Sequence, residues 1–282
     1  MGEVYAEPRF FIKEMEMDNR AIGFFDSGLG GLTSVPVLKR ALPNEKVLYF
    51  GDTARTPYGS KSPDTVCKFS AQVVDYLVSK NVKLIVIACN TVTAMALDML
   101  REKHPEVPIV GVIDPTARRV AADGVCNVGI IGTKVTIESG VYAESIHSLN
   151  PNINTYSLAC PAFVPLIEEG IIDNEIMDLT IKYYMDDFVK NNNIDSLILG
   201  CTHYPLITAN IKRIYPELKL YNSSAEVISD VVDILTEKDM LAGENDFPDR
   251  FYASDLSENF LRMTNTLFEG YDTKIKLKKL DD

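Results

Sequence analysis

Short apolar stretches alternate with stretches of helical spacing along most of the chain, and this alternation limits the fold more than any other feature. Eight stretches of four to six residues have the length of buried strands and contain no interior proline, as central strands require. Between two of them, residues 65–80 repeat apolar side chains at the 3.6-residue period of a helix. Strands that alternate with helices form βαβ units, so the sequence predicts an α/β fold with parallel sheets. The predicted strands are residues 21–25, 46–50, 83–88, 109–112, 127–131, 154–157, 196–199 and 218–221.

The two halves of the chain share a weak internal pattern. In the first half, one predicted strand ends at Asp26 and a later one at Cys89; in the second half, the corresponding strands end at Thr133 and Cys201. We interpret the pattern as a structural duplication into two similar, pseudo-symmetric α/β lobes, with coincidence as the alternative. Open parallel sheets bind ligands at the carboxyl ends of their strands. An active site is therefore expected in the cleft between the lobes.

The boundaries of the lobes are predicted at turns, because the chain has no obvious Gly/Ser-rich linker. Asp114-Pro115 is the predicted crossing into the second lobe, and Asn222-Ser223-Ser224 is the predicted return. The predicted organisation is residues 1–20 as an N-terminal extension, 21–113 plus 223–282 as a discontinuous first lobe, and 114–222 as the second lobe.

Charge and composition exclude several classes of protein. The 28 Lys+Arg and 40 Asp+Glu give a net charge of −12 without a basic cluster, which argues against nucleic acid as the main partner. No run approaches the roughly 18 apolar residues that cross a bilayer, and the first twenty residues lack the apolar core of a secretory signal. Five cysteines are an odd number in a chain without an export signal, so reduced thiols are expected rather than a disulfide framework.

Two loops rich in hydrogen-bond donors follow predicted strands of the first half. The turn DSGLGGL (residues 26–32) resembles an anion-binding helix start, but its spacing matches neither nucleotide-binding glycine motif. Its Asp26 is either the cap of a structural turn or a carboxylate in a cleft. The loop GDTARTPYG (residues 51–59) could close over a small polar ligand, and an ordinary surface loop is the alternative.

Each half carries a cysteine where a strand gives way to a helix, in IACNT (residues 87–91) and LGCTHYPL (residues 199–206). A helix start is expected to lower the pKa of such a thiol. Three interpretations compete. A metal site lacks further ligands at suitable spacing, and a Cys-His-Asp hydrolase leaves one thiol unexplained. A two-thiol acid–base site explains both.

The two-thiol interpretation has a definite chemical logic. Inverting a stereocentre by proton exchange needs a base on one face of the carbon and an acid on the other. Thiols have an ordinary pKa of about 8.5 and can be tuned into either role. Asp26 beside one thiol and His203 beside the other would assist the proton transfers.

Four motifs together resemble the cofactor-independent glutamate racemases, members of the aspartate/glutamate racemase family. They are FFDSGLGGLT (24–33), YFGDTARTPYG (49–59), IACNT (87–91) and LGCTHYPL (199–206), in matching order and spacing. The resemblance implies a two-lobed α/β fold with the site between the lobes. It implies interconversion of L- and D-glutamate, with Cys89 taking the α-proton from D-glutamate and Cys201 taking it from L-glutamate.

The resemblance also assigns roles to further residues. It makes Cys89 and Cys201 the catalytic thiols, with Asp26 and His203 as auxiliary catalytic groups, and Glu168 as an acid that orients the histidine. The residues implied to bind substrate are Asp26, Ser27, Tyr58, Gly59, Asn90, Thr91, Thr133, Thr136, Thr202 and His203.

The resemblance further implies catalysis with no cofactor, neither pyridoxal phosphate nor a metal. The implied setting is the bacterial cytoplasm, with D-glutamate supplied for peptidoglycan synthesis. The expected partners are L- and D-glutamate, with a homodimer left open and neither nucleic acid nor a membrane. Two other functions stay open at this point: a racemase of aspartate or a related acid, and a silent amino-acid-binding protein on the same fold.

Overall fold

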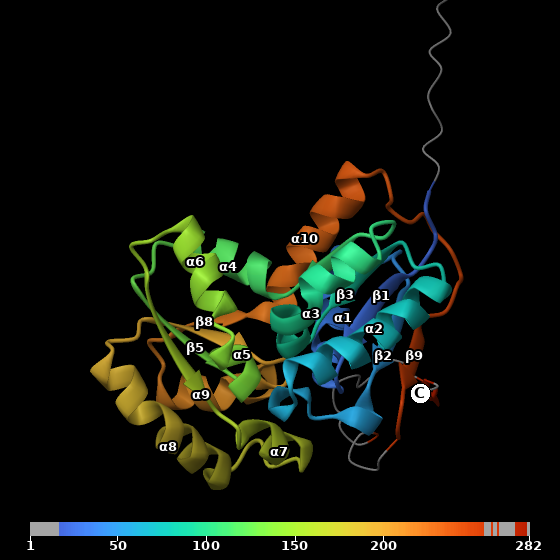
Figure 1. Cartoon of the computed structure of the whole chain (residues 1–282). Coiled ribbons are helices and arrows are strands. Elements are labelled where there is room, and N and C mark those ends of the chain that lie inside the picture. The colour runs from blue at the N-terminus through green and yellow to red at the C-terminus, as the bar shows by residue number, and fades with distance from the viewer. Residues whose placement is uncertain (1–16, 257–260, 262–263, 265–273, 281–282) are drawn as a thin grey trace, which may run out of the picture.

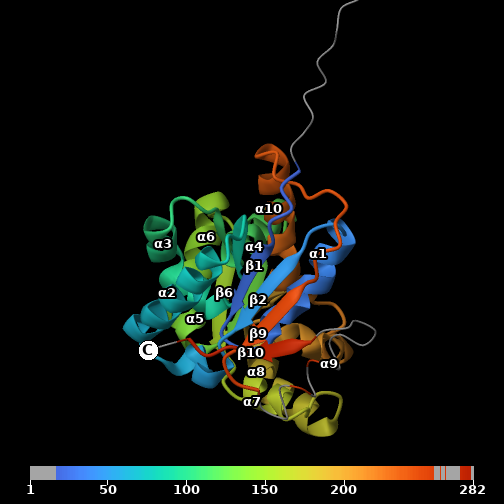
Figure 2. The same cartoon turned by 90° about the vertical axis from the view of Figure 1, so that its right-hand side faces the viewer.

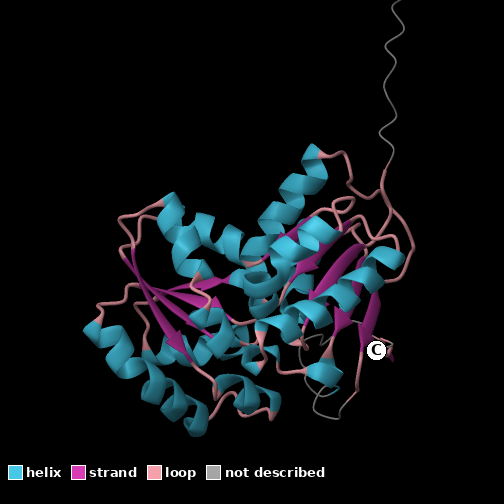
Figure 3. Cartoon of the chain, in the orientation of Figure 1, coloured by secondary structure: helices cyan, strands magenta, loops and turns pink. Residues whose placement is uncertain are grey.

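The computed structural model describes residues 17–256, 261, 264 and 274–280. Its strands form two all-parallel sheets that lie side by side, each flanked by helices (Figures 1 and 3). All eight predicted strands are present, so the predicted α/β class with two parallel sheets is confirmed. The strands are β1 (Ile22–Asp26), β2 (Val47–Gly51), β3 (Leu84–Ile87), β4 (Ile109–Gly111), β5 (Asn127–Gly132), β6 (Asn154–Ala159), β7 (Ser196–Gly200), β8 (Lys219–Asn222), β9 (Arg250–Ala253) and β10 (Ile275–Leu277).

Neighbouring parallel strands must be joined by crossover connections, and helices provide most of them here. The longest ones are amphipathic and bury one face; the predicted helix at residues 65–80 is α2, which begins at Pro63 with Ser62 as its cap. The α-helices are α1 (Val35–Ala41), α2 (Pro63–Ser79), α3 (Asn90–Lys103), α4 (Ile113–Ala122), α5 (Lys134–Glu138), α6 (Val141–Leu149), α7 (Phe163–Glu168), α8 (Glu175–Asn191), α9 (Thr208–Ile214) and α10 (Ser223–Glu237). The 3-10 turns are η1 (Gly30–Ser34), η2 (Thr53–Arg55), η3 (Tyr58–Ser60) and η4 (Tyr204–Ile207).

Four strands of the first sheet have the same order as the four strands of the second. The first sheet, β10-β9-β2-β1-β3-β4, contains the run β2-β1-β3-β4, and the second is β6-β5-β7-β8, so each strand of the second sheet has a counterpart in the first. In the first, Phe25 pairs with Ile87, which places Cys89 two residues beyond the last pair; in the second, Gly132 pairs with Gly200, directly before Cys201. Extending the first register by one residue aligns Asp26 with Ala88, so the two cysteines occupy equivalent positions. This supports the predicted structural duplication.

The C-terminal part of the chain returns to the first sheet. There β9 pairs with β2, and β10 pairs with β9, as the view in Figure 2 shows. These two strands were not predicted, because they are short and carry the charged Arg250 and Lys276. Helix α10 packs against α4 on one side and against α1 and η1 on the other. The predicted lobe boundaries stay predictions.

Only the last four residues of the predicted N-terminal extension lie within the described part of the chain. Asp18 N–H donates to the Leu241 carbonyl at 3.2 Å, and Asn19 Oδ1 accepts from Gly243 N–H at 3.1 Å. The buried Lys83 ammonium bonds to the Asp18 carbonyl at 2.7 Å and forms a 2.7 Å ion pair with Glu45. The described end of the extension is therefore attached near the amino ends of β2 and β3. No described helix is long and apolar enough to cross a membrane.

Candidate active site

A cavity of about 530 Å³ opens at the carboxyl ends of both sheets. Its walls are the segments that follow β1, β2 and β3 on one side and β5, β6 and β7 on the other. This is the edge at which open parallel sheets bind ligands. Eleven of the residues predicted from the sequence line it: Ser27, Tyr58, Gly59, Cys89, Asn90, Thr91, Thr133, Glu168, Cys201, Thr202 and His203.

Cys89 lies between β3 and α3, with its sulfur 3.4 Å from Ser27 Oγ. Cys89 is 6% exposed. Burial, and next the carboxylate of Asp26, raise the pKa of the Cys89 thiol to about 12, although the Val92 N–H at the helix start lowers it. The expectation that the helix start would lower the pKa overall is wrong here, because desolvation and a neighbouring anion outweigh it. Cys89 is therefore a protonated thiol at neutral pH.

Asp26 is completely buried behind the cleft wall. Its Oδ2 accepts hydrogen bonds from Gly31 N–H at 3.0 Å and Gly28 N–H at 3.3 Å. The glycine-rich turn does bind an anion, but that anion is its own aspartate, so these N–H groups do not point into the cleft. Burial raises the pKa of Asp26. Among the described residues Oδ1 has no hydrogen-bond partner, which leaves one acceptor atom near Cys89.

Cys201 follows β7 and is also 6% exposed, but its neighbours differ. Its sulfur lies 3.8 Å from His203 Nδ1, and His203 Nε2 lies 3.2 Å from Glu168 Oε1 at the end of α7. Burial alone would lower the pKa of His203, yet the contacts with Cys201 and Glu168 raise it to about 10. The ring is therefore an imidazolium at neutral pH, and Cys201 lies beside a cation.

Three threonine hydroxyls connect the two sides of the cleft. Thr91 Oγ1 lies 2.9 Å from Thr133 Oγ1 and 3.1 Å from Thr136 Oγ1, and the latter two are 2.9 Å apart. Thr136 belongs to this ring but does not itself line the cavity. A hydroxyl can donate and accept, so the ring can reorient toward a carboxylate.

Two glycines allow the opposing turns to approach closely. A Cβ on Gly30 would lie 2.3 Å from Thr202 Oγ1, and a Cβ on Gly59 would lie 2.5 Å from the Thr133 Cβ. Neither position has room for a side chain unless the facing turn moves. The glycines are thus needed for the spacing across the cleft.

The loop after β2 contributes backbone rather than its long side chains. The Tyr58 hydroxyl donates to the buried Asp52 carboxylate, which also accepts from Ser254 Oγ at 2.8 Å. Arg55 pairs with the same carboxylate at 2.7 Å and lies over the Phe69 ring at 4.2 Å. The Tyr58 side chain is buried with its hydroxyl on Asp52, and Tyr58 and Gly59 both line the cavity.

Comparison with known proteins shows to which family a chain with this fold and site belongs. The model of the family "Asp/Glu/Hydantoin racemase" matches residues 35–231. The chain belongs to this family. It is accordingly an isomerase of the racemase class. It is 44% identical over 256 residues to the glutamate racemase of Geobacter metallireducens, with 89% of this chain and 93% of that protein covered.

Solved glutamate racemases have the same fold as this racemase. The Francisella tularensis enzyme in complex with D-glutamate matches with a TM-score of 0.88 at 40% identity, covering 94% of this chain and 99% of that one. The Escherichia coli enzyme in complex with L-glutamate and the activator UDP-MurNAc-Ala matches with a TM-score of 0.77 at 25% identity, covering 93% of this chain and 100% of that one.

The structure adds lining residues that the motifs did not indicate. Lys134 is the one Lys or Arg among the described residues that line the cleft, and its side chain is 67% exposed. Cys160 lies in the wall next to Tyr204, whose hydroxyl donates to the Cys160 carbonyl at 3.1 Å. Asp255 reaches the cleft from beyond β9. Lys134 follows the candidate Thr133 directly and could have been found from it; Asp255 is placed only by the tertiary fold.

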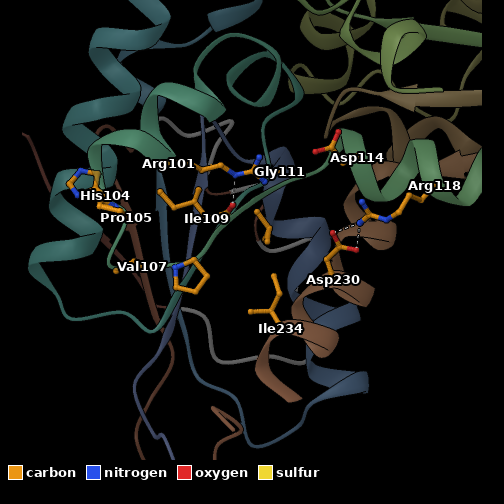
Figure 4. A pocket seen from close by; sticks show the side chains of 12 residues that line it. Arg101, His104, Pro105, Val107, Ile109, Gly111, Asp114, Arg118, Asp230 and Ile234 are labelled. Atoms are coloured by element: carbon orange, nitrogen blue, oxygen red, sulfur yellow. Dashed lines mark hydrogen bonds and ion pairs between the residues drawn. The ribbon is translucent and has the colours of Figure 1, made fainter. Parts of the chain in front are cut away.

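A second cavity, of about 370 Å³, lies between β4, α3, α4 and α10. Figure 4 shows Arg118 of α4 paired with Asp230 of α10 at its wall. No residue predicted for the site lines this cavity, and it holds no thiol. Within the described ranges of the chain, no three His, Cys, Asp or Glu side chains are grouped to hold a metal ion.

Proposed function

We propose that this racemase interconverts L- and D-glutamate by a two-base mechanism in which Cys89 and Cys201 act from opposite faces of the α-carbon. The observation that carries the proposal is the placement of two equally buried thiols at equivalent strand ends around one cavity. One thiol has a carboxylate behind it and the other has an imidazolium beside it. The glutamate complexes of the related enzymes support the choice of substrate.

The cleft offers partners for each charge of glutamate. The Ser27 hydroxyl is an acceptor for the α-ammonium near Cys89, and the Asp26 carboxylate, which does not line the cavity, attracts the ammonium through its charge. The N–H groups at the start of α3, at Asn90 and Thr91, donate to a carboxylate and gain from the helix dipole. The threonine ring and the N–H groups of the loop after β2 offer further donors. Thr202 and His203 complete the contacts on the Cys201 side.

The proposed proton transfers begin with a proton on Cys89, whose pKa is raised, and use Cys201, beside the His203 imidazolium, as the base. The Cys201 thiolate takes the α-proton of L-glutamate, and the electron pair of the C–H bond moves into the α-carboxylate, whose charge is met by donors in the dry cleft. The Cys89 thiol then delivers its proton to the opposite face, which gives D-glutamate and a Cys89 thiolate. The reverse reaction restores the starting state. Glu168 orients His203, and His203 and Asp26 assist their respective thiols.

The same chemistry needs no group beyond the chain's own side chains. The acid, the base and the donors for the developing charge are all protein groups, so catalysis proceeds without pyridoxal phosphate or a metal. The biological role is the supply of D-glutamate for bacterial peptidoglycan, in the cytoplasm, where the thiols stay reduced. A homodimer stays a prediction.

The test is α-proton exchange in deuterated water with the purified, reduced protein. Incubation with either enantiomer of glutamate is expected to give the other enantiomer with deuterium at the α-carbon, measured by NMR and circular dichroism. L-aspartate serves as the competing substrate and is expected to react far more slowly. Absence of exchange with glutamate would contradict the proposal, and faster turnover of aspartate would reassign the substrate.

A further inference from the structure

The side-chain amide of Asn90, directly after Cys89, is held by two residues from distant parts of the chain. The Tyr142 hydroxyl donates to Asn90 Oδ1 at 2.6 Å, and Asn90 Nδ2 donates to Ser223 Oγ at 3.3 Å. Tyr142 stands at the start of α6, and Ser223 is the first residue of α10. All three residues are at most 2% exposed. Such buried polar contacts are strong constraints on orientation.

The orientation of the amide follows from counting protons. Ser223 Oγ donates its single proton to the Leu199 carbonyl at 3.1 Å, because that oxygen can only accept. Ser223 must therefore accept from Asn90, so the amide nitrogen faces it and Oδ1 faces Tyr142. Burial raises the pKa of Tyr142, which keeps the donated proton in place. One Nδ2–H remains, and Asn90 lines the cleft.

The same two residues contact the strand that carries the other thiol. Leu199, the acceptor for Ser223, precedes Cys201 by two positions on β7. The Tyr142 ring lies over Gly200: a Cβ on that glycine would be 3.4 Å from Tyr142 Cε2. Tyr142 and Ser223 thus join the turn after Cys89 to the strand before Cys201.

We propose that Tyr142 and Ser223 are positioning residues of the racemase, which fix the Asn90 amide against β7 and so aim its free N–H at the substrate held between the two thiols. The inference rests on the proposed function of the cleft. Neither residue touches the substrate itself. Their loss would leave a buried amide partly unpaired and free to rotate.

Tyr142→Phe tests the inference, with Tyr221→Phe as a matched control. Both tyrosines are 2% exposed, belong to one apolar cluster and use their hydroxyls, but Tyr221 bonds to Asp123 at 3.2 Å, away from the cleft. The Asn90 contact is present in the ground state and the transition state, so Tyr142→Phe is expected to raise KM for both enantiomers about tenfold and to change kcat less than about threefold. Tyr221→Phe is expected to change KM by less than about twofold, because its hydroxyl has no link to Asn90.

Ser223→Ala is the second variant and is expected to raise KM in the same way, which keeps the test valid if Tyr142→Phe does not fold. In the double variant the KM should not exceed that of the worse single variant by more than about twofold, because both act on one amide. An unchanged KM in the folded single variants, equal effects in Tyr142→Phe and Tyr221→Phe, or fully multiplicative effects would overturn the positioning role. Wild-type protein without glutamate racemisation would instead overturn the proposed function, and the inference with it.

Discussion

The turns that carry Cys89 and Cys201 occupy equivalent positions in two sheets that share a run of four strands in the same order, and both cysteines are 6% exposed. Their electrostatic surroundings are nevertheless opposite. Cys89 has the buried Asp26 carboxylate behind it, and its pKa is raised to about 12. Cys201 has His203 beside it. The pKa of His203 is raised to about 10, so its ring carries a positive charge at neutral pH.

The difference shows that a duplicated backbone can supply symmetric geometry while single side chains supply an asymmetric charge distribution. The proposed two-base mechanism needs both properties. Two faces of one carbon must be reached alike, yet in each cycle one thiol must be an acid while the other is a base. Because enantiomers have equal free energies in water, the asymmetry cannot shift the equilibrium. The asymmetry decides only which of the two thiols is protonated before the substrate binds.

The comparison of Cys89 with Cys201 assumes that both thiols are required, and it would be contradicted most directly if one of them proved dispensable. Cys89→Ser and Cys201→Ser are each expected to lower kcat by about 10²–10⁴-fold, because a hydroxyl is a far weaker acid–base group at neutral pH. Glutamate binding, measured by calorimetry, should persist in both. Cys126→Ser, at an exposed cysteine before β5, is the control and should keep full activity. Full activity in either catalytic variant would contradict the two-base account.

The spacing of the two turns is tested at Gly30. Gly30→Ala would place a Cβ 2.3 Å from Thr202 Oγ1 and 2.7 Å from the Thr202 carbonyl carbon, so the Cys201 turn must move. A displacement of about 1 Å is expected to lower kcat/KM by up to about 10²-fold. Gly23→Ala in β1 meets only side chains at 3.3–3.4 Å and should stay far more active. Equal activity of the two variants would show that the turns tolerate separation.

Alkylation rates test whether the different electrostatic surroundings of Cys89 and Cys201 change the reactivity of the two thiols. With iodoacetamide at pH 8, Cys201 is expected to react about tenfold faster than Cys89 or more, because the two are equally exposed and the raised pKa of Cys89 leaves little thiolate. Peptide mass spectrometry over time gives both rates. Asp26→Asn removes the anion behind Cys89 and should speed its reaction. Glutamate should protect both thiols, and similar rates in the wild type would remove the proposed asymmetry.

The smallest expected effect concerns stability. The folded-state pKa of His203, about 10, lies above its ordinary value of 6.5, so its charge stabilises the fold fully below pH 6.5 and progressively less up to pH 10. The melting temperature of the wild type relative to His203→Gln should therefore fall across this window by a few degrees. Calorimetry at pH 6, 8 and 10 measures the difference. A constant difference would mean that the ring is uncharged in the folded protein.

The sequence by itself determined the repeating parts of this protein. The eight predicted strands are present, since a buried strand is a local pattern of apolar residues and its end is marked by polar ones. The position of both cysteines at strand ends follows directly, as does the α/β class. The strands β9 and β10 escaped prediction because they are short and the charged Arg250 and Lys276 interrupt their apolar pattern.

Only the tertiary structure decided the burial and the hydrogen bonds around those cysteines. The glycine-rich turn uses its N–H groups on Asp26, Tyr58 turns its hydroxyl to Asp52, and the Asn90 amide is held by Tyr142 and Ser223. Burial and the charges of distant residues set each pKa, and neither can be read from local spacing. The expected lowering of the Cys89 pKa was wrong for this reason: the helix start is local to the sequence, whereas the desolvation that overrides it is produced by the whole fold.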